Sequence, residues 1–123
     1  MMADLFEKKW VIYVLELEGE RFYVGRTTEK NLSYRLHDHE TQSDNSAKFW
    51  TMKHKVVKRR EELFRYNASP FEEDMMVKEM MAVYGVDNVG GGSYPLETRT
   101  PEQRKFIENE ISGALDQCLY CKE

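Results

Sequence analysis

The amino-acid sequence predicts an α/β fold in which a small central antiparallel β-sheet of about three strands is flanked by helices. Two runs of β-branched and aromatic residues near the start predict a hairpin, and three later segments carry helical spacing or helix-start signals. A chain of 123 residues fits one domain, because a globular chain of this size buries about two-thirds of its unfolded surface. Residues 1–123 are therefore expected to form a single domain.

The first predicted element is a β-hairpin. Trp10 to Leu17 is rich in β-branched and aromatic residues, and it ends at the polar turn Glu18 to Glu20. Arg21 to Gly25 then resumes the strand pattern. The two runs are close enough in sequence to pair as antiparallel neighbours.

The length of the turn decides which side chains share a face. With a three-residue loop, Tyr13 lies opposite Gly25 and Tyr23 opposite Leu15, so that both tyrosines lie on one face. A two-residue loop would put them on opposite faces. Gly19 can adopt a positive φ and permits the longer turn, but the sequence does not decide between the two.

A helix is predicted over Asn31 to Glu40. Leu32 and Leu36 lie one turn apart on its apolar side, and Arg35 and His39 lie one turn apart beside them. The arginine and histidine therefore share a helix face, and we expect them to converge with the two tyrosines at the mouth of the sheet.

The middle of the chain predicts a third strand and a second helix. His54 to Leu63 has two valines among charges and reads as a strand with poor alternation. Ser69 as N-cap, Pro70 at the first position and Glu72 at the third predict a helix start, and Gly85 predicts its end. Four side chains at helical spacing should form its buried side: Met76, Val77, Met80 and Tyr84.

The last predicted elements are a loop and a helix. Asp87 to Tyr94 is rich in glycine but lacks the Gly-Lys-Ser/Thr ending of a nucleotide-binding loop. Thr100 to Gln103 is a capping box that opens a final helix, which should pack on the sheet. Its expected buried side is Phe106, Ile107, Ile111, Ala114 and Leu115.

Composition places the chain among soluble globular proteins. It has 41% apolar and 33% charged residues and no long apolar run, so we expect no membrane span or signal peptide and an intracellular location. Cys118 and Cys121 have the spacing of half a zinc site, and their number agrees with a reducing compartment. We expect no structural zinc within this chain.

The charge pattern is divided. The net charge of −4 argues against a nucleic-acid binder, yet Lys48 to Arg65 holds seven Lys and Arg against two Glu. Such a run is more often a solvated face than a binding surface. Because Phe49 and Trp50 lie within it and aromatic rings can stack on bases, a phosphate-binding surface is also possible. Its expected contacts are Lys53, Lys55, Lys58 and Arg59.

The order of the candidate residues resembles that of the GIY-YIG nucleases, a family named for two motifs on its first two strands. The motifs here read Val11-Ile12-Tyr13 and Tyr23-Val24-Gly25, and the Arg35-x-x-x-His39 helix and Glu73 follow in the family's order. The resemblance covers most of the chain. Val11 replaces the first glycine of the family name, which removes no family catalytic side chain.

A narrower resemblance is to a subgroup of these domains found in large DNA viruses. It rests on Phe49-Trp50-Thr51, the Glu73-Asp74 pair, and the segments Tyr84 to Val89 and Gly91 to Tyr94. The arginine expected after Val89 is Gly90 here, a change expected to weaken substrate contact.

The resemblance implies a metal-dependent endonuclease that hydrolyses phosphodiester bonds in DNA. Glu73 would hold Mg²⁺ or Mn²⁺ as the only protein ligand, and Arg35 would stabilise the phosphate. Tyr13 would take the proton from water, either through a lowered pKa or by passing its own proton to His39. Tyr23 would orient the reactants by a hydrogen bond.

Two other functions stay open from the sequence. The same fold could be a catalytically inactive module that binds nucleic acid or a protein, or a host-directed interaction protein without a nucleic-acid role. Retention of all five side chains favours the enzyme, whereas the net charge and Gly90 favour the alternatives.

Overall fold

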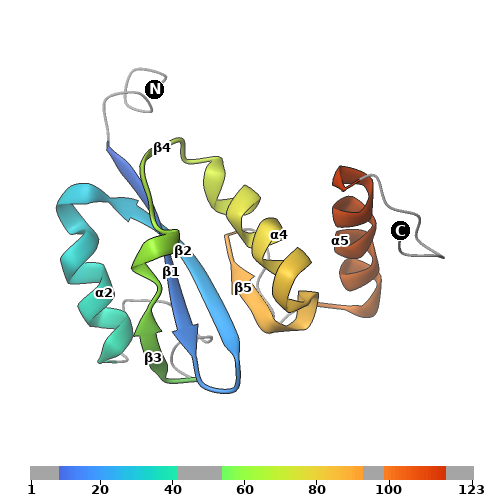
Figure 1. The fold of residues 1–123 in the computed structure, drawn as a ribbon, viewed down its shortest axis with the longest axis horizontal. Helices are drawn as coiled ribbons and strands as arrows, with labels where there is room; N and C mark the ends of the chain where they lie inside the picture. The colour runs from blue at the N-terminus through green and yellow to red at the C-terminus, as the bar shows by residue number, and fades with distance from the viewer. Residues whose placement is uncertain (1–8, 42–53, 93–98, 116–123) are drawn as a thin grey trace.

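The computed structural model describes residues 9–41, 54–92 and 99–115. It is an α/β fold built on one five-stranded mixed sheet, with α2 on one side, α4 on the other and α5 beyond α4 (Figure 1). The strands are β1 (Trp10–Leu17), β2 (Arg21–Thr28), β3 (Val56–Arg59), β4 (Arg65–Ala68) and β5 (Val89–Gly91). The helices are α2 (Leu32–Glu40), α4 (Glu72–Tyr84) and α5 (Pro101–Ala114), with 3-10 turns η1 (Glu29–Asn31), η2 (Glu61–Leu63) and η3 (Val86–Asn88).

The β1–β2 hairpin has the register expected for a three-residue loop. Tyr13 pairs with Gly25 and Leu15 pairs with Tyr23, so the two tyrosines share a face. Gly19 has a φ of +75°, a value that its missing Cβ makes inexpensive. Strand β2 extends three residues beyond the predicted end, to Thr28.

The prediction of about three antiparallel strands was wrong. Strands β3 and β4 both pair with β1 in antiparallel fashion, whereas β5 pairs with β2 in parallel. Of the predicted strand His54 to Leu63, only Val56–Arg59 forms β3, and η2 follows it. The predicted loop after Asp87 instead contains η3 and β5. Both missed strands are short and lack an alternating apolar pattern.

The hairpin is buried on both faces. Ile12, Val14, Phe22 and Val24 face α4 and pack in an apolar cluster with its Met76, Val77, Met80 and Met81. Tyr13, Leu15 and Leu17 face α2 and pack with its Leu36. Every residue from Val11 to Leu15 is therefore fully buried, although side chains alternate along the strand.

Helix α4 begins two residues later than predicted. The hydroxyl of Ser69 accepts from the Phe71 N–H at 3.1 Å, and the Glu72 carboxylate accepts from the Ser69 N–H, so the expected capping residues order the turn that leads into the helix. Gly85 ends the helix as predicted, with φ +102° and its N–H donating to the Met81 carbonyl.

The predicted apolar side of α4 is largely confirmed. Met76, Val77 and Met80 are buried. Tyr84 stays partly exposed, but its ring packs 4.2 Å from that of Phe22, measured between centroids.

Helix α5 begins at the predicted capping box, in which Thr100 and Gln103 exchange hydrogen bonds. The prediction that it packs on the sheet was wrong, because α4 already covers that face and α5 contacts mainly α4 and η3. Ile107 is buried as expected, whereas Phe106 is 66% exposed and Leu115 51% exposed. Ala114 is also exposed, contrary to expectation.

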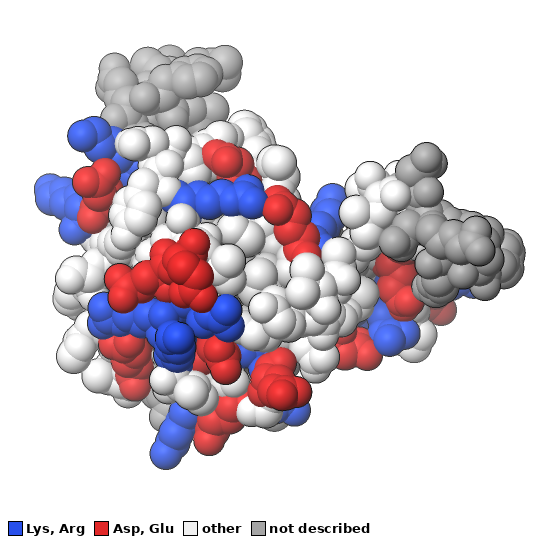
Figure 2. Space-filling model, in the orientation of Figure 1, with Lys and Arg blue, Asp and Glu red and all other residues white. Residues whose placement is uncertain are grey.

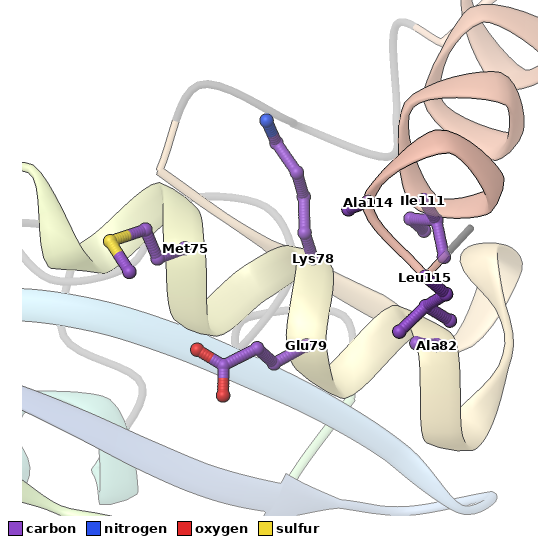
Figure 3. A pocket seen from close by; sticks show the side chains of 7 residues that line it. All are labelled: Met75, Lys78, Glu79, Ala82, Ile111, Ala114 and Leu115. Carbon is purple, nitrogen blue, oxygen red and sulfur yellow. The ribbon is translucent and has the colours of Figure 1, made fainter.

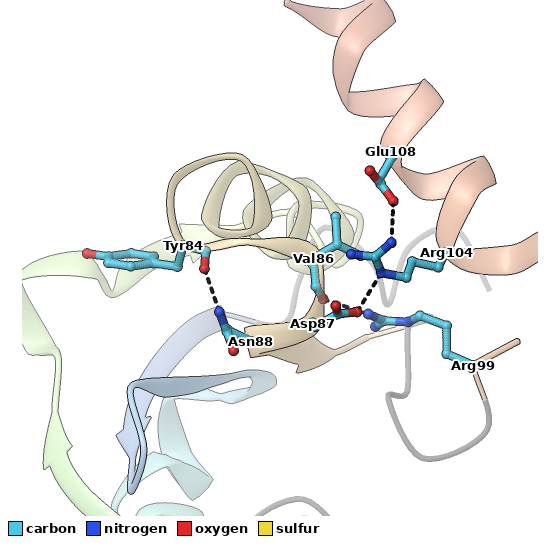
Figure 4. Close-up of polar contacts among 7 residues, drawn as sticks. All are labelled: Tyr84, Val86, Asp87, Asn88, Arg99, Arg104 and Glu108. Carbon is cyan, nitrogen blue, oxygen red and sulfur yellow. Dashed lines mark hydrogen bonds and ion pairs between the residues drawn. The ribbon is translucent and has the colours of Figure 1, made fainter. Parts of the chain in front are cut away.

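Polar contacts hold the start of α5 against η3 (Figure 4). Arg104 forms ion pairs with Asp87 at 2.8 Å and with Glu108 at 3.0 Å. Arg99 donates to the Val86 carbonyl at 2.6 Å. These contacts fix η3, and with it the start of β5.

In the part of the chain that the structure describes, no helix is both long enough and apolar enough to cross a membrane. The predictions for Phe49, Trp50, Lys53, Cys118 and Cys121 fall outside the described residues.

Candidate active site

The face of the sheet under α2 brings two tyrosines and a histidine together. Tyr13 Oη lies 2.7 Å from Nε2 of His39, and both residues are fully buried. The Tyr23 ring lies 6.3 Å from the Tyr13 ring and 5.0 Å from the His39 ring, measured between centroids. Strand alternation and helix periodicity thus produce the convergence that the sequence predicted.

Gly25 makes room for the Tyr13 phenol. The ring of Tyr13 crosses over its cross-strand partner, so that a Cβ at position 25 would overlap the Cζ and Oη atoms of Tyr13. Any other residue here would have to displace the ring from His39. Steric overlap with the Tyr13 ring therefore explains why the second motif ends in glycine in this structure.

Burial raises the pKa of Tyr13 well above its ordinary value, and the nearby Tyr23 adds to this. Arg35 lowers this pKa through its charge and a hydrogen bond, whereas the charge of Glu73 raises it. A protonated phenol can donate the bond to Nε2 of His39. Burial therefore favours the neutral phenol over a phenolate at this position.

Arg35 and Glu73 reach the same phenol from opposite sides of the sheet. Arg35 lies on α2 one turn before His39, and Glu73 lies in the first turn of α4. Both act on the pKa of Tyr13. Tyr13, Tyr23 and His39 are therefore in direct contact, whereas Arg35 and Glu73 act on Tyr13 through their charges.

Glu73 itself has a sheltered carboxylate. Its side chain is 15% exposed, and Oε1 lies 3.9 Å from Nε of Arg26. Burial raises the pKa of Glu73; Arg26 lowers it, Asp74 raises it, and a hydrogen bond from the Gly92 N–H lowers it. A Cβ at Gly92 would overlap Asp74, so the glycine lets the backbone approach these carboxylates.

Sequence reasoning missed Arg26 and Gly92 as neighbours of Glu73. Arg26 carried one signal: it is a charged residue on a strand face whose two preceding members, Phe22 and Val24, are apolar. Gly92 carried none, because its approach to α4 depends on the unpredicted pairing of β5 with β2.

Glu73 is the candidate metal ligand. Within the described residues, no three His, Cys, Asp or Glu side chains gather closely enough to form a metal site. A single sheltered carboxylate fits Mg²⁺ or Mn²⁺ when water and substrate oxygens complete the coordination shell. It does not fit a cation held by protein ligands alone.

Three arginines of the basic segment form ion pairs with carboxylates of other elements: Arg59, Arg60 and Arg65. Arg59, one of the expected phosphate contacts, donates two hydrogen bonds of 2.7 and 2.8 Å to Glu40 of α2, which lowers the pKa of Glu40. Lys55 and Lys58 are exposed. Figure 2 accordingly shows red and blue side chains intermixed on this face of the molecule.

Two further arginines of this segment are also paired. Arg60 lies 3.0 Å from Glu16 and 2.7 Å from Glu62, and Arg65 lies 2.9 Å from Glu79. The local excess of positive charge seen in the sequence is therefore reduced in the folded protein.

A hollow of about 290 Å³ lies between α4 and α5. Met75 and Ala82 of α4 and Ile111 and Leu115 of α5 are among the side chains that line it (Figure 3). None of the five candidate catalytic residues contributes to its wall.

A scan of protein-family models found no match, and neither the curated proteins nor the solved structures gave one. The resemblance to the GIY-YIG nucleases therefore depends on the sequence motifs.

Proposed function

We propose that this protein is a metal-dependent endonuclease of the GIY-YIG type that hydrolyses phosphodiester bonds in DNA. One observation carries the proposal: a buried tyrosine, Tyr13, is hydrogen-bonded to His39 and lies within electrostatic reach of both Arg35 and Glu73. Hydrolysis of a phosphodiester requires a proton acceptor, a cation on the phosphate and charge stabilisation at the leaving oxygen. These residue types supply all three.

In this proposal, Tyr13 relays a proton. The raised pKa of Tyr13 argues against a standing phenolate, so its hydroxyl passes its own proton to Nε2 of His39 as it accepts one from the attacking water. Tyr23, which is partly exposed, orients that water or a phosphate oxygen by a hydrogen bond. Arg35 presents a planar fork to the phosphate.

Glu73 is the residue proposed to hold Mg²⁺ or Mn²⁺. A divalent cation held by Glu73 would supply charge stabilisation on the phosphate and would activate water for attack. The Gly92 N–H positions the carboxylate by its hydrogen bond.

Cleavage of supercoiled, linear and branched DNA tests the proposal, in parallel reactions with Mg²⁺, with Mn²⁺ and with chelator. We expect metal-dependent cleavage by the unmutated protein and its loss in Glu73→Gln, which keeps the shape but not the charge. Glu79→Gln is the matched control, since it lies on the same helix with an exposed side chain paired to Arg65. Cleavage that survives Glu73→Gln would mean that the carboxylate is wrongly assigned, and Glu72 and Asp74 would then be tested.

A second candidate is a catalytically inactive module that binds nucleic acid or a protein. The net charge of −4 and the ion pairs that occupy Arg59, Arg60 and Arg65 favour it. A nucleic-acid-binding module would bind DNA in chelator without cleaving it in any metal, and a protein-binding module would do neither. Under either function, replacing Lys55 and Lys58 by Gln should lower the salt dependence of DNA binding by about two released ions. An unchanged slope would assign these lysines to a solvated face.

A further inference from the structure

Arg26 is a charged residue next to the candidate active site, and the proposed reaction gives it no role. It directly follows Gly25 on β2, so its side chain leaves the opposite face of the sheet, toward α4. Its Nη1 donates to the Pro70 carbonyl at 3.0 Å, and its Cζ lies 5.0 Å from the centroid of the Trp10 ring. These contacts hold the guanidinium beside Glu73.

The contact between Arg26 and Glu73 is looser than those of the other arginines. The ion pairs that Arg59, Arg65 and Arg104 form with carboxylates measure 2.7 to 3.0 Å, which is hydrogen-bond distance. The distance from Arg26 Nε to Glu73 Oε1 is 3.9 Å. Arg26 therefore balances the charge of Glu73 without a direct hydrogen bond between these two atoms.

The two side chains also differ in exposure. The side chain of Arg26 is 39% exposed and that of Glu73 is 15% exposed, so the cation lies nearer to solvent than the carboxylate. Without Arg26, a polyanion that approaches Glu73 from solvent would meet only the negative charge of the carboxylate. An exposed guanidinium beside that charge offers a fork that matches a phosphate group.

We propose that Arg26 is the counter-ion of Glu73 in the metal-free protein and that its exposed guanidinium contacts a backbone phosphate of the nucleic acid, with or without a divalent cation at Glu73. The inference rests on the proposed function and adds a phosphate-binding residue to it. Arg26 and the metal then share one carboxylate and repel each other. Arg26 therefore weakens metal binding to the free protein and strengthens binding of the polyanion.

The Arg26→Gln variant tests both effects. Gln keeps a donor near the Pro70 carbonyl but removes the charge. Binding of Mn²⁺ to the protein alone, followed by the electron paramagnetic resonance of free Mn²⁺, should tighten about threefold to tenfold. Binding of a fluorescein-labelled DNA duplex in chelator, followed by anisotropy, should weaken about threefold to tenfold, and its salt dependence should fall by about one ion.

Arg104→Gln is the control for net charge. Arg104 is paired with Asp87 and Glu108 where α5 meets η3, so its loss makes the same charge change away from Glu73. We expect it to leave both affinities nearly unchanged. Circular dichroism of each variant checks that the fold is intact.

Glu73→Gln separates failure of this inference from failure of the proposed function. If it abolishes Mn²⁺ binding and cleavage while Arg26→Gln changes neither affinity, the inference is wrong and the nuclease proposal stands. If no DNA is cleaved but Arg26→Gln shifts the two affinities in opposite directions, the inference stands and the nuclease proposal fails. An unmutated protein that binds no Mn²⁺, or a Glu73→Gln variant that binds it normally, overturns both.

Discussion

The two faces of the β1–β2 hairpin are both buried, but they are built differently. Under α4, Ile12 and Val24 belong to a cluster made only of apolar side chains. Under α2, the buried set includes the hydrogen-bonded pair Tyr13 and His39 beside Leu15. Apolar burial stabilises a fold directly, whereas a buried hydrogen bond contributes only about 0.5–1.5 kcal/mol net. Both faces thus provide apolar burial, but only the second contains a buried hydrogen bond between two titratable side chains.

Substitution on the apolar face should have the largest effect on stability. Ile12→Ala leaves a cavity in a fully buried cluster and should lower the free energy of unfolding by about 2–5 kcal/mol. Denaturant titration measures this. Val57→Ala on β3 is the control, because its side chain is 63% exposed, and it should stay within about 0.5 kcal/mol. Equal effects at the two sites would contradict the contrast between the faces.

Gly25→Ala should have the second-largest effect on stability. It acts on the face under α2, through steric overlap with the Tyr13 ring. The new methyl group displaces the Tyr13 phenol, and we expect a loss of about 1–3 kcal/mol together with loss of cleavage. Gly113→Ala on α5 has open space around it and should instead stabilise by about 0.5–1 kcal/mol. If Gly25→Ala were also stabilising, the ring of Tyr13 would not lie over position 25 in solution.

Tyr13→Phe should separate chemistry from stability. It removes the hydrogen bond to His39 while keeping the ring, so stability should fall by only about 1 kcal/mol. Cleavage should fall by about 10²-fold or more, because the proton relay is lost. Tyr66→Phe, at an exposed position on β4, should change neither. Full activity in Tyr13→Phe would remove this tyrosine from the mechanism.

The smallest expected effect is the pH dependence contributed by Glu73. Burial raises the pKa of Glu73, so the folded protein keeps this proton to a higher pH than the unfolded chain, whose value is about 4.3. Between these two pKa values, stability falls as the pH rises. The unfolding free energy of Glu73→Gln should therefore decline less from about pH 4 to pH 7 than that of the unmutated protein. Parallel pH profiles would mean that the carboxylate is solvated.

The local elements around the site were predictable because their signals are local. The residue types of Trp10 to Leu17 and the turn at Gly19 specify the hairpin, whereas its register depends on the loop length, which the structure fixes at three residues. The spacing of Arg35 and His39 specifies a shared helix face. Such features depend on neighbours within a few residues, so the sequence displays them directly.

The short strands and the position of α5 were not predictable in this way. Strand β4 (Arg65–Ala68) pairs only with the start of β1, and β5 (Val89–Gly91) is a three-residue segment next to β2. Neither has the alternating apolar pattern by which a strand can be predicted from sequence. Each forms a strand because a neighbouring strand, distant in sequence, supplies its hydrogen-bond partners. Helix α5 has an apolar side, but only the tertiary structure shows that α4 occupies the face of the sheet it was expected to cover.

The sequence by itself determined that the chain opens with a hairpin carrying two tyrosines, and that an arginine and a histidine lie one helical turn apart. The structure decided that the two tyrosines share a face, because it fixed the loop at three residues. Only the tertiary structure decided that Tyr13 bonds His39, 26 residues away, and that Glu73 lies beside Arg26. It also decided that Glu40 neutralises Arg59, which no count of local charge could show. The physical reason is that periodicity acts along the chain, whereas steric fit and Coulomb interactions act through space between segments distant in sequence.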